Sequence, residues 1–401
     1  MTRHAKRHLK WLLGLGTLGL LVTGALNIAV NPWRVLPRKT EVQSLDRYRE
    51  IDAEIRTCKA GLAMRGPWDI LVLGSSRANI GMDPTHPAFG GLRTINLGLD
   101  GGDLFETRAM LDHALKSQSP KRAILFLDAG DLTRIGKLAN ESDFEFSPLA
   151  SGDPLERELK YVFSQRAVDS SVATLAMAAK HKTPAYTTLG LRMKKPARFD
   201  YFETMEKFYL PWAIQLADIQ RQKRGIQQDK VEVVRAMLDA CAKKSVEAIL
   251  VIPSNHITLC QAMEERGAPD PWFLEERRII AGLVADANRD HPEHPCQFWD
   301  FNIPSPITLE PYPPDRKTPM VNWLDPIHFT PPAGGRYTSL LLGSSQEDPA
   351  LAIHVDPNHP DAYLDKVTQL IQAAATALPA EREGIRKALA ADSKPTVPPK
   401  H

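Results

Sequence analysis

Two stretches of the chain, far apart in sequence, carry side chains that could act together in nucleophilic chemistry. The first begins with residues 70–73, Ile-Leu-Val-Leu, which lead directly into Gly74-Ser75-Ser76. A short, uninterrupted apolar run predicts a strand buried on both faces of a parallel sheet. Ligands of such sheets bind beyond the carboxyl ends of the strands, which is where the two serines fall. A plain polar turn is the alternative, and the choice depends on whether the chain also supplies a base.

The second stretch, Trp323-Leu-Asp-Pro-Ile-His-Phe329, supplies a base. A serine hydroxyl needs a neighbouring base to become a nucleophile, and a histidine base needs a group that holds its other ring nitrogen. Asp325 and His328 are three residues apart, a spacing that puts both side chains on one face of a helical turn. An Asp-x-x-His sequence also occurs in ordinary loops. Together with the serine turn, however, it predicts a catalytic set of Ser76, His328 and Asp325.

The elements that must position this set alternate between strands and helices. Apolar runs predict five strands, over 69–73, 94–97, 122–127, 248–252 and 297–301. Helical periodicity predicts helices over 104–116, with Asp103 as the N-cap, and over 230–243 and 271–288. Strands that alternate with helices indicate an α/β fold, in which about five parallel strands are covered by helices on both faces.

Composition excludes some classes of function. The chain has 401 residues, of which 43% are apolar and 24% charged, as in globular proteins, and its net charge of +2 indicates no nucleic-acid partner. We find no phosphate-binding glycine loop and predict no cofactor. His291, His294 and Cys296 are interleaved with two prolines, which favours a loop over a metal site, so we predict no metal.

Four cysteines are present: Cys58, Cys241, Cys260 and Cys296. In an oxidising compartment they could form up to two disulfides, with three pairings open. We favour Cys260 with Cys296, because both lie near the ends of predicted strands.

The N-terminus predicts a membrane anchor. Residues 11–30 carry no charge, and twenty helical residues span about 30 Å, the thickness of a bilayer core. No clean signal-peptidase site follows, so we expect an uncleaved helix. The basic residues before it favour the cytoplasm, which would put the main domain in a periplasm-like space. Trp11 and Trp33 bracket the segment as interfacial anchors do.

The rest of the chain divides at changes of pattern. An amphipathic helix is expected over about 42–64, and the third and fourth strands are much farther apart than a crossover requires. The intervening segment is therefore interpreted as a helical insertion that covers the carboxyl ends of the strands. The expected organisation is a cytoplasmic segment 1–10, an anchor 11–30, a connecting segment 31–67, a main domain 68–345 with the insertion 144–227, C-terminal helices 346–391 and a disordered tail 392–401.

The main domain resembles the SGNH (GDSL-like) hydrolase superfamily, in particular the membrane-anchored, cell-envelope members related to DltD and the alginate O-acetylation proteins. Gly74-Ser75-Ser76, Asn96-Leu-Gly-Leu-Asp-Gly101 and Asp325-Pro-Ile-His328 are similar to three of its sequence blocks. The similarity covers about 69–131 and 246–342. It implies a flavodoxin-like three-layer sandwich with five parallel strands. It also implies a triad of Ser76, His328 and Asp325, with the backbone N–H groups of Ser76 and Gly101 in the oxyanion hole.

One block departs from the superfamily pattern. Asp131 stands where the family has an asparagine that donates to the oxyanion. A carboxylate cannot donate that hydrogen bond, and losing one such donor typically costs about 3–4 kcal/mol. Three readings remain open: Asp131 is protonated, it has another role, or Arg77 supplies the positive charge. Arg77 could instead form a salt bridge with Asp128 or Asp131. His256, after the fourth strand, is a candidate substrate contact.

The resemblance implies a periplasmic serine acyl-transfer enzyme, an O-acetyltransferase or esterase, that acts on an exopolysaccharide or other envelope polymer. Envelope relatives of this type often work with a multi-spanning membrane O-acyltransferase that delivers the acyl group. The alternative is a catalytically weak SGNH-like scaffold that binds polysaccharide or such a partner.

Overall fold

The protein has an α/β fold built around one mixed sheet. The computed structural model describes residues 3–133, 141–193, 200–222, 225–315, 317–343 and 347–392. Six strands lie in the order β2-β1-β3-β4-β5-β8, and only β8 runs antiparallel to its neighbour. Their bounds are β1 Ile70–Leu73, β2 Thr94–Asn96, β3 Arg122–Phe126, β4 Glu247–Ile252, β5 Gln297–Asp300 and β8 Ile353–His354. The five expected strands are confirmed to within two residues at each end.

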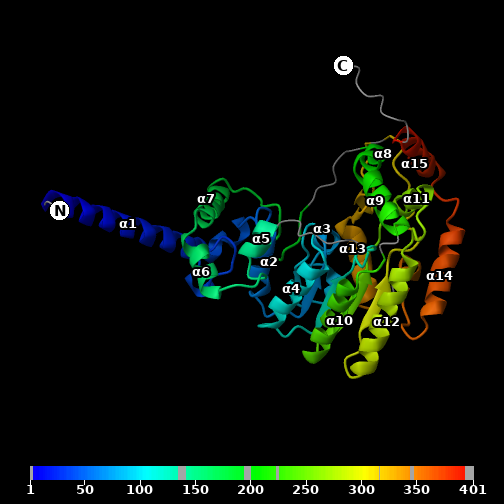
Figure 1. Cartoon of the computed structure of the whole chain (residues 1–401), viewed down its shortest axis with the longest axis horizontal. Helices are drawn as coiled ribbons and strands as arrows, with labels where there is room; N and C mark the ends of the chain where they lie inside the picture. The colour runs from blue at the N-terminus through cyan, green and yellow to red at the C-terminus, as the bar shows by residue number, and fades with distance from the viewer. Residues whose placement is uncertain are drawn as a thin grey trace, which may run out of the picture.

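Helices cover both faces of this sheet, as expected. The chain moves from β1 to β2 in one direction and from β2 towards β5 in the other, so right-handed crossovers put the helix after β1 on one face and the later crossover helices on the other. Figure 1 shows the later helices side by side. The helix after β1 is α3 Ser76–Gly81, and the later helices are α4 Leu104–Leu115, α10 Gln228–Lys243 and α12 Leu274–Asp290. Asp103 caps α4 through a full capping box with Glu106.

The C-terminal part of the chain adds a sixth strand to the sheet, beside β5. After α13 Pro331–Leu341 and the short helix η5 Pro349–Leu351, the strand β8 pairs with β5. Two helices follow, α14 Pro360–Ala373 and α15 Pro379–Asp392, as the sequence predicts for 346–391. The two-residue strand β8 is too short to leave a periodic signal and was not predicted. Of the expected tail, residues 393–401 lie outside the described residues.

The prediction of one amphipathic helix over 42–64 is wrong. Its first part is the 3₁₀ helix η2 Gln43–Tyr48, preceded by η1 Arg38–Thr40, and only α2 Ile55–Ala63 is α-helical. The reason is a buried charge. The side chain of Arg49 donates to the carbonyl oxygen of Val30 at 2.9 Å and pairs with Glu41 and Asp46. These contacts bend the chain back onto the end of the first helix instead of letting it continue.

That first helix, α1 Arg3–Val30, joins the basic and the apolar N-terminal segments in one element. Among the described residues it is the single helix long and apolar enough to cross a membrane. Figure 1 shows it projecting from the body, with its inner end flanked by two helices, α6 Pro154–Phe163 and α7 Gln165–Ala179. These helices hold α1 through Asn27, whose amide donates to the Val162 carbonyl at 2.8 Å and accepts from the Ser171 hydroxyl at 2.7 Å.

Trp33 is not an interfacial anchor, contrary to the prediction. Its side chain is 2% exposed and packs edge-on against Phe146, at 5.0 Å between ring centroids, and against Tyr161. Phe146 ends the short helix α5 Glu141–Phe146. The indole is therefore part of the protein core just beyond the anchor.

The long insertion between β3 and β4 divides into two parts. Its first part, α5 to α7, packs around α1 and α2. Its second part packs on α11 Thr258–Glu265 and consists of α8 Tyr201–Thr204, the π-helix η4 Met205–Tyr209 and α9 Leu210–Arg221. The expected cover over the carboxyl ends of the strands thus applies to the second part and to the segment 186–192 before it, which contacts Asn96 at the end of β2 and Asn79 of α3.

The cysteines form no disulfide. All four thiols are free and buried, so the favoured pairing of Cys260 with Cys296 is wrong. Cys241 instead lies close enough to Cys296 for the two to interact electrostatically.

A contact between two glycines fixes the separation of α3 and α13. A Cβ atom at Gly334 would lie 1.9 Å from the carbonyl oxygen of Gly81, so the two helices touch through their backbones. The helix α3 begins at Ser76, and α13 begins three residues after His328. The glycine contact therefore sets how closely the helix that begins at Ser76 approaches the segment that contains His328.

We predict that Gly334→Ala lowers the free energy of unfolding by about 1–3 kcal/mol, because the methyl group forces the two helices apart. Denaturant unfolding of the full chain in detergent measures this change. Gly282→Ala in α12 is the matched control, since nothing lies within 4 Å of the added Cβ. Relief of the helical glycine there should leave stability unchanged or raise it by up to about 1 kcal/mol. Equal stability of the two variants would contradict the prediction.

Candidate active site

Ser76 stands at the carboxyl end of β1, an interior strand between β2 and β3, at the first position of α3. Ser75 caps this helix, since its hydroxyl accepts a hydrogen bond from the N–H of Arg77 at 3.3 Å. Gly74 makes the turn possible: its φ is +140°, and a Cβ there would lie 2.5 Å from the Cβ of Phe126. The N–H of Ser76 has no intrahelical acceptor, because it belongs to the first turn. The serine side chain is half-buried, so a substrate can reach it.

Asp325 and His328 lie on a tight hairpin rather than on the expected helical turn. The strands β6 Trp323–Asp325 and β7 His328–Phe329 pair antiparallel, and the two residues face each other across Pro326 and Ile327. The Asp325 carboxylate accepts hydrogen bonds from the Nδ1 of His328 at 2.8 Å and from the N–H groups of Ile327 and His328. The prediction that Asp325 holds the imidazole is confirmed, although its structural basis was wrong.

The hydroxyl of Ser76 lies 2.7 Å from the Nε2 of His328, so the three side chains form one hydrogen-bonded chain. A carboxylate only accepts hydrogen bonds, which places the imidazole proton on Nδ1 and leaves the Nε2 lone pair for the serine O–H. In this arrangement His328 can take the serine proton as the oxygen attacks an electrophile. Asp325 then stabilises the charged ring.

His256 supports the hairpin and does not contact the solvent. Its backbone N–H donates to the carbonyl of Pro326 at 2.9 Å. Its ring is fully buried, with Nδ1 bonded to the hydroxyl of Thr258 at 2.9 Å and Nε2 to the carbonyl of Glu310 at 2.7 Å. Burial lowers the pKa of His256 to about 4, so the ring is neutral. The sequence analysis proposed His256 as a substrate contact. In this conformation both ring nitrogens are bonded within the protein, so the ring has none left for a substrate.

The loop after β2, which carries Gly101, is held against the first turn of α3. The N–H of Leu99 donates to the carbonyl of Gly74 at 2.8 Å, and the amide of Asn79 donates to Asp100 at 2.6 Å. A Cβ at Gly98 would lie 2.5 Å from the backbone nitrogen of Asn79, so only glycine permits this approach. Gly101 itself has a φ of +63°, a turn conformation that favours glycine. Its role as an oxyanion donor stays a prediction.

A buried lysine beneath this loop was missed by the sequence analysis. The ammonium group of Lys59, in α2, donates to the side chain of Asn79 and the carbonyl of Asn96, each at 2.8 Å, and to the carbonyl of Gly190 at 2.5 Å. Its three donors are matched by three oxygens, and burial lowers its pKa. Lys59 thereby ties α2 and the insertion to the loop beside Ser76. No local sequence signal marks it, because its partners are distant in the chain.

Arg77 joins the carboxyl ends of three strands. It follows Ser76 after β1, forms a salt bridge with Asp128 after β3, and donates to the side chain of Asn255 after β4 at 2.5 Å. The guanidinium is almost fully buried. The sequence left two alternatives for Arg77, a positive charge at the oxyanion or a salt bridge with Asp128 or Asp131. The structure contains the salt bridge, and the partner is Asp128.

Asp131 stabilises the loop after β3 in which it lies. Its Oδ2 atom accepts a hydrogen bond from the N–H of Asp128 at 3.0 Å. Behind the loop lies Glu276 of α12, whose carboxylate oxygens accept from the N–H groups of Gly130 at 2.8 Å and Leu132 at 3.3 Å. Burial, and next the negative charge of Asp131, raise the pKa of Glu276 to about 8. Asp131 thus acts as a hydrogen-bond acceptor that shapes the loop after β3.

Tyr209, at the end of the π-helix η4, is a second residue that sequence reasoning missed. Its hydroxyl interacts with Asp325, and its pKa is raised by burial and then by the charge of that carboxylate. π-helical turns are rare and often occur at functional sites. Here the turn lets the insertion contact the acidic member of the triad.

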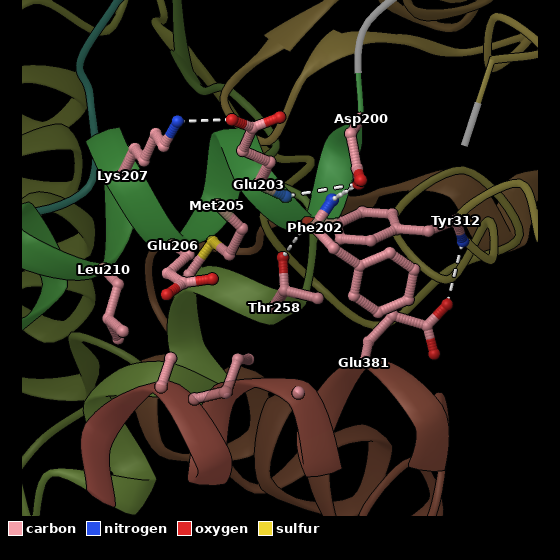
Figure 2. Close-up of a pocket in the computed structure, with 13 residues that line it drawn as sticks. Asp200, Phe202, Glu203, Met205, Glu206, Lys207, Leu210, Thr258, Tyr312 and Glu381 are labelled. Atoms are coloured by element: carbon pink, nitrogen blue, oxygen red, sulfur yellow. Dashed lines mark hydrogen bonds and ion pairs between the residues drawn. The ribbon is translucent and has the colours of Figure 1, made fainter. Parts of the chain in front are cut away.

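A cavity of about 410 Å³ lies behind the hairpin, between η4 and α15, and is shown in Figure 2. The ring of Tyr312 forms part of its wall and packs against the His256 ring, at 4.8 Å between centroids. The N–H of Tyr312 donates to Glu381 of α15 at 2.8 Å (Figure 2). No member of the triad lines this cavity, but its wall residue Thr258 is hydrogen-bonded to the His256 ring, and the backbone N–H of His256 holds the β6–β7 hairpin.

Searches against protein-family models and against curated protein sequences found no match to this chain.

We predict that stability falls as the pH rises from about 4.5 to about 8 through the titration of Glu276. In this window the folded chain holds a proton that the unfolded chain has already lost, so higher pH favours unfolding. Glu276→Gln, which cannot titrate, should flatten this part of the profile, measured as the free energy of unfolding against pH. The control is Glu275→Gln, a change at the exposed neighbour, which should keep the slope. An unchanged slope in Glu276→Gln would contradict the assignment.

Proposed function

We propose that this protein is a membrane-anchored serine acyl-transfer enzyme of the SGNH type. The observation that carries the proposal is the hydrogen-bonded chain from Ser76 through His328 to Asp325, with distances of 2.7 and 2.8 Å. Three residue types in this order activate a serine for attack on an ester. A buried hairpin with no catalytic task would not need an accessible serine opposite its histidine.

The strand order supports the same family. The five parallel strands run 2-1-3-4-5, which is the flavodoxin-like arrangement. The proposed nucleophile follows β1, and the glycine-containing loop after the neighbouring strand β2 lies beside it. In this proposal the N–H groups of Ser76 and Gly101 bind the oxyanion, as in the superfamily.

The reaction proceeds in two half-reactions. The Ser76 oxygen attacks the acyl carbonyl while His328 accepts its proton, and the proton then passes to the leaving alkoxide as the acyl-enzyme forms. In the second half-reaction His328 takes a proton from the acceptor hydroxyl as the acceptor oxygen attacks the acyl carbonyl. The bond to Ser76 then breaks, and His328 returns the proton to the serine oxygen. A sugar hydroxyl gives transfer, and water gives hydrolysis. Asp325 holds the imidazole throughout.

The proposed setting is the periplasmic face of the cytoplasmic membrane. The basic start of α1 followed by a long apolar helix supports a single-pass anchor with the main domain outside the cytoplasm. Polymers of the cell envelope, such as exopolysaccharides, are then the substrates within reach. A multi-spanning membrane O-acyltransferase is the proposed acyl donor system.

One observation favours a second candidate, a catalytically weak scaffold that binds polysaccharide or a membrane partner. The position of the third oxyanion donor is taken by Asp131, whose carboxylate accepts a hydrogen bond from the backbone. The buried Arg77 already pairs with Asp128, and this salt bridge accounts for much of its charge. Reactivity of Ser76 separates the two candidates.

We predict that a fluorophosphonate forms a single covalent adduct with the full chain in detergent, detected by intact mass. Ser76→Ala should abolish the adduct, and Asp325→Asn should slow its formation by roughly 10²–10⁴-fold, because the amide no longer enforces the reactive imidazole tautomer. Ser75→Ala is the matched control, since it removes the neighbouring hydroxyl and leaves the triad intact.

Circular dichroism of each variant verifies that the fold is retained. An adduct on a folded Ser76→Ala variant, or none on the folded wild-type chain, would remove the enzymatic proposal and favour the scaffold. If the adduct forms as predicted, acyl donors and sugar acceptors are the next assays.

A further inference from the structure

The two helices that grip α1 expose an apolar surface. In α6 the exposed residues Leu155, Leu159 and Phe163 recur every fourth position and form one stripe. In α7 Val172 and Leu175 are exposed, and these five side chains keep between 39% and 63% of their area accessible. Single exposed apolar residues are ordinary, but a stripe of large ones marks a surface that is normally covered. In this subsection "the hairpin" means the helical hairpin formed by α6 and α7, and not the β6–β7 hairpin of the candidate active site.

The apolar surface of the hairpin is continuous with that of α1. A Cβ at Gly24 would lie 2.9 Å from the ring of Phe163, so the stripe on α6 ends against the anchor. Just before this contact α1 exposes Leu20, Leu21 and Val22. The stripe on α6 thus adjoins the apolar surface of the anchor at Gly24.

The length of α1 places this face inside the bilayer. A hydrocarbon core of about 30 Å that begins after Lys10 extends to about Val30 at 1.5 Å per residue. The protein body, however, already encloses the helix from Gly24 onward, where Gly24, Asn27 and Val30 are buried. The last seven residues of the span, about 10 Å, therefore overlap in depth with the hairpin. If the bilayer ended at Thr23, the anchor would be too short.

We propose that the hairpin is embedded in the outer half of the bilayer, with lipid acyl chains covering Leu155, Leu159, Phe163, Val172 and Leu175. This inference rests on the proposed anchoring of α1. A depth of about 10 Å agrees with amphipathic helices that lie in the membrane interface. The buried Asn27 fits the same picture, because both its donor and its acceptor are satisfied inside the protein.

Charged residues mark the edges of the embedded surface. Between Asp169 and Lys180, every exposed residue of α7 is apolar, and Lys180, His181 and Lys182 follow at once. Cations at this level can contact lipid phosphates. On α6 the exposed Glu156 and Lys160 pair with each other at 2.8 Å, which lowers the cost of a position near the interface.

Lipid, rather than a second copy of the chain, is the occupant that accounts for the overlap. A dimer could cover the stripe, but it would leave the span short by the same 10 Å. Embedding in lipid both covers the apolar stripe and gives α1 the length that the bilayer core requires. The hairpin is also clamped to the helix that enters the membrane, so the orientation of the catalytic domain relative to the bilayer is fixed on two elements instead of one.

The test uses environment-sensitive fluorescence in the full chain. One cysteine is introduced at a time, as Leu159→Cys or Leu175→Cys in the hairpin, labelled with a nitrobenzoxadiazole dye, and the chain is reconstituted into phosphatidylcholine–phosphatidylglycerol vesicles. The four native thiols are buried and do not compete. Lipids with a nitroxide on the upper acyl chain should quench most of the emission from both hairpin sites. Leu18→Cys in α1 reports the anchor, and Val321→Cys, 72% exposed on the body, is the matched apolar control.

Quenching at Leu18→Cys and at both hairpin sites, with none at Val321→Cys, supports the proposal. Quenching at Leu18→Cys alone leaves the anchor in place but overturns embedding of the hairpin, and a blue-shifted, unquenched hairpin label would then indicate a protein partner or second copy. An unquenched label at Leu18→Cys removes the anchoring itself, and the proposal falls with it. Quenching at Val321→Cys as well shows non-specific adsorption of the body and also overturns the proposal.

Discussion

The hydrogen bond between Ser76 and His328 joins two residues that are 252 positions apart, and much of the fold serves to keep its length at 2.7 Å. One partner is fixed by the turn after β1, the other by a hairpin that contributes only two short strand segments of its own. The β6–β7 hairpin is held by the backbone N–H of His256, which donates to the carbonyl of Pro326, and by the indole of Trp323, which donates to the carbonyl of Ile307 at 2.8 Å. A small displacement in either support would break the hydrogen bond between Ser76 and His328, because hydrogen bonds weaken steeply with distance and angle.

Sequence patterns were sufficient where the determining forces are local. The buried strands, the capped start of α4 and the grouping of Ser76, Asp325 and His328 follow from apolar runs, capping chemistry and the rule that parallel strands present ligands at their carboxyl ends. The same approach failed where a distant partner decides the outcome. The helix expected over 42–64 is interrupted because Arg49 is buried against Val30, and Trp33 faces Phe146 rather than lipid.

Much of the support for the site is likewise invisible in sequence. Lys59, Tyr209 and Glu276 come from α2, the insertion and α12, and each acts on a loop or hairpin far from it in the chain. Charged groups are rarely buried unless their hydrogen-bonding atoms are satisfied. Their positions therefore become informative only once the partners are known. The insertion illustrates this: one half grips the anchor and the other half reaches Asp325, so a single excursion of the chain links the membrane-proximal end to the triad.

The four free cysteines have a consequence for how the native state can be observed. Burial raises the pKa of Cys241 and Cys260 to about 12 and that of Cys296 to about 11, and it raises the pKa of Cys58 as well. Since the thiolate is the reactive form, each thiol is shielded both by packing and by its protonation. Alkylation of a given thiol then requires that its surroundings open. The thiols lie in α2, in α10, in α11 and just before β5, so their separate alkylation rates report the local opening of four parts of the core without any added probe.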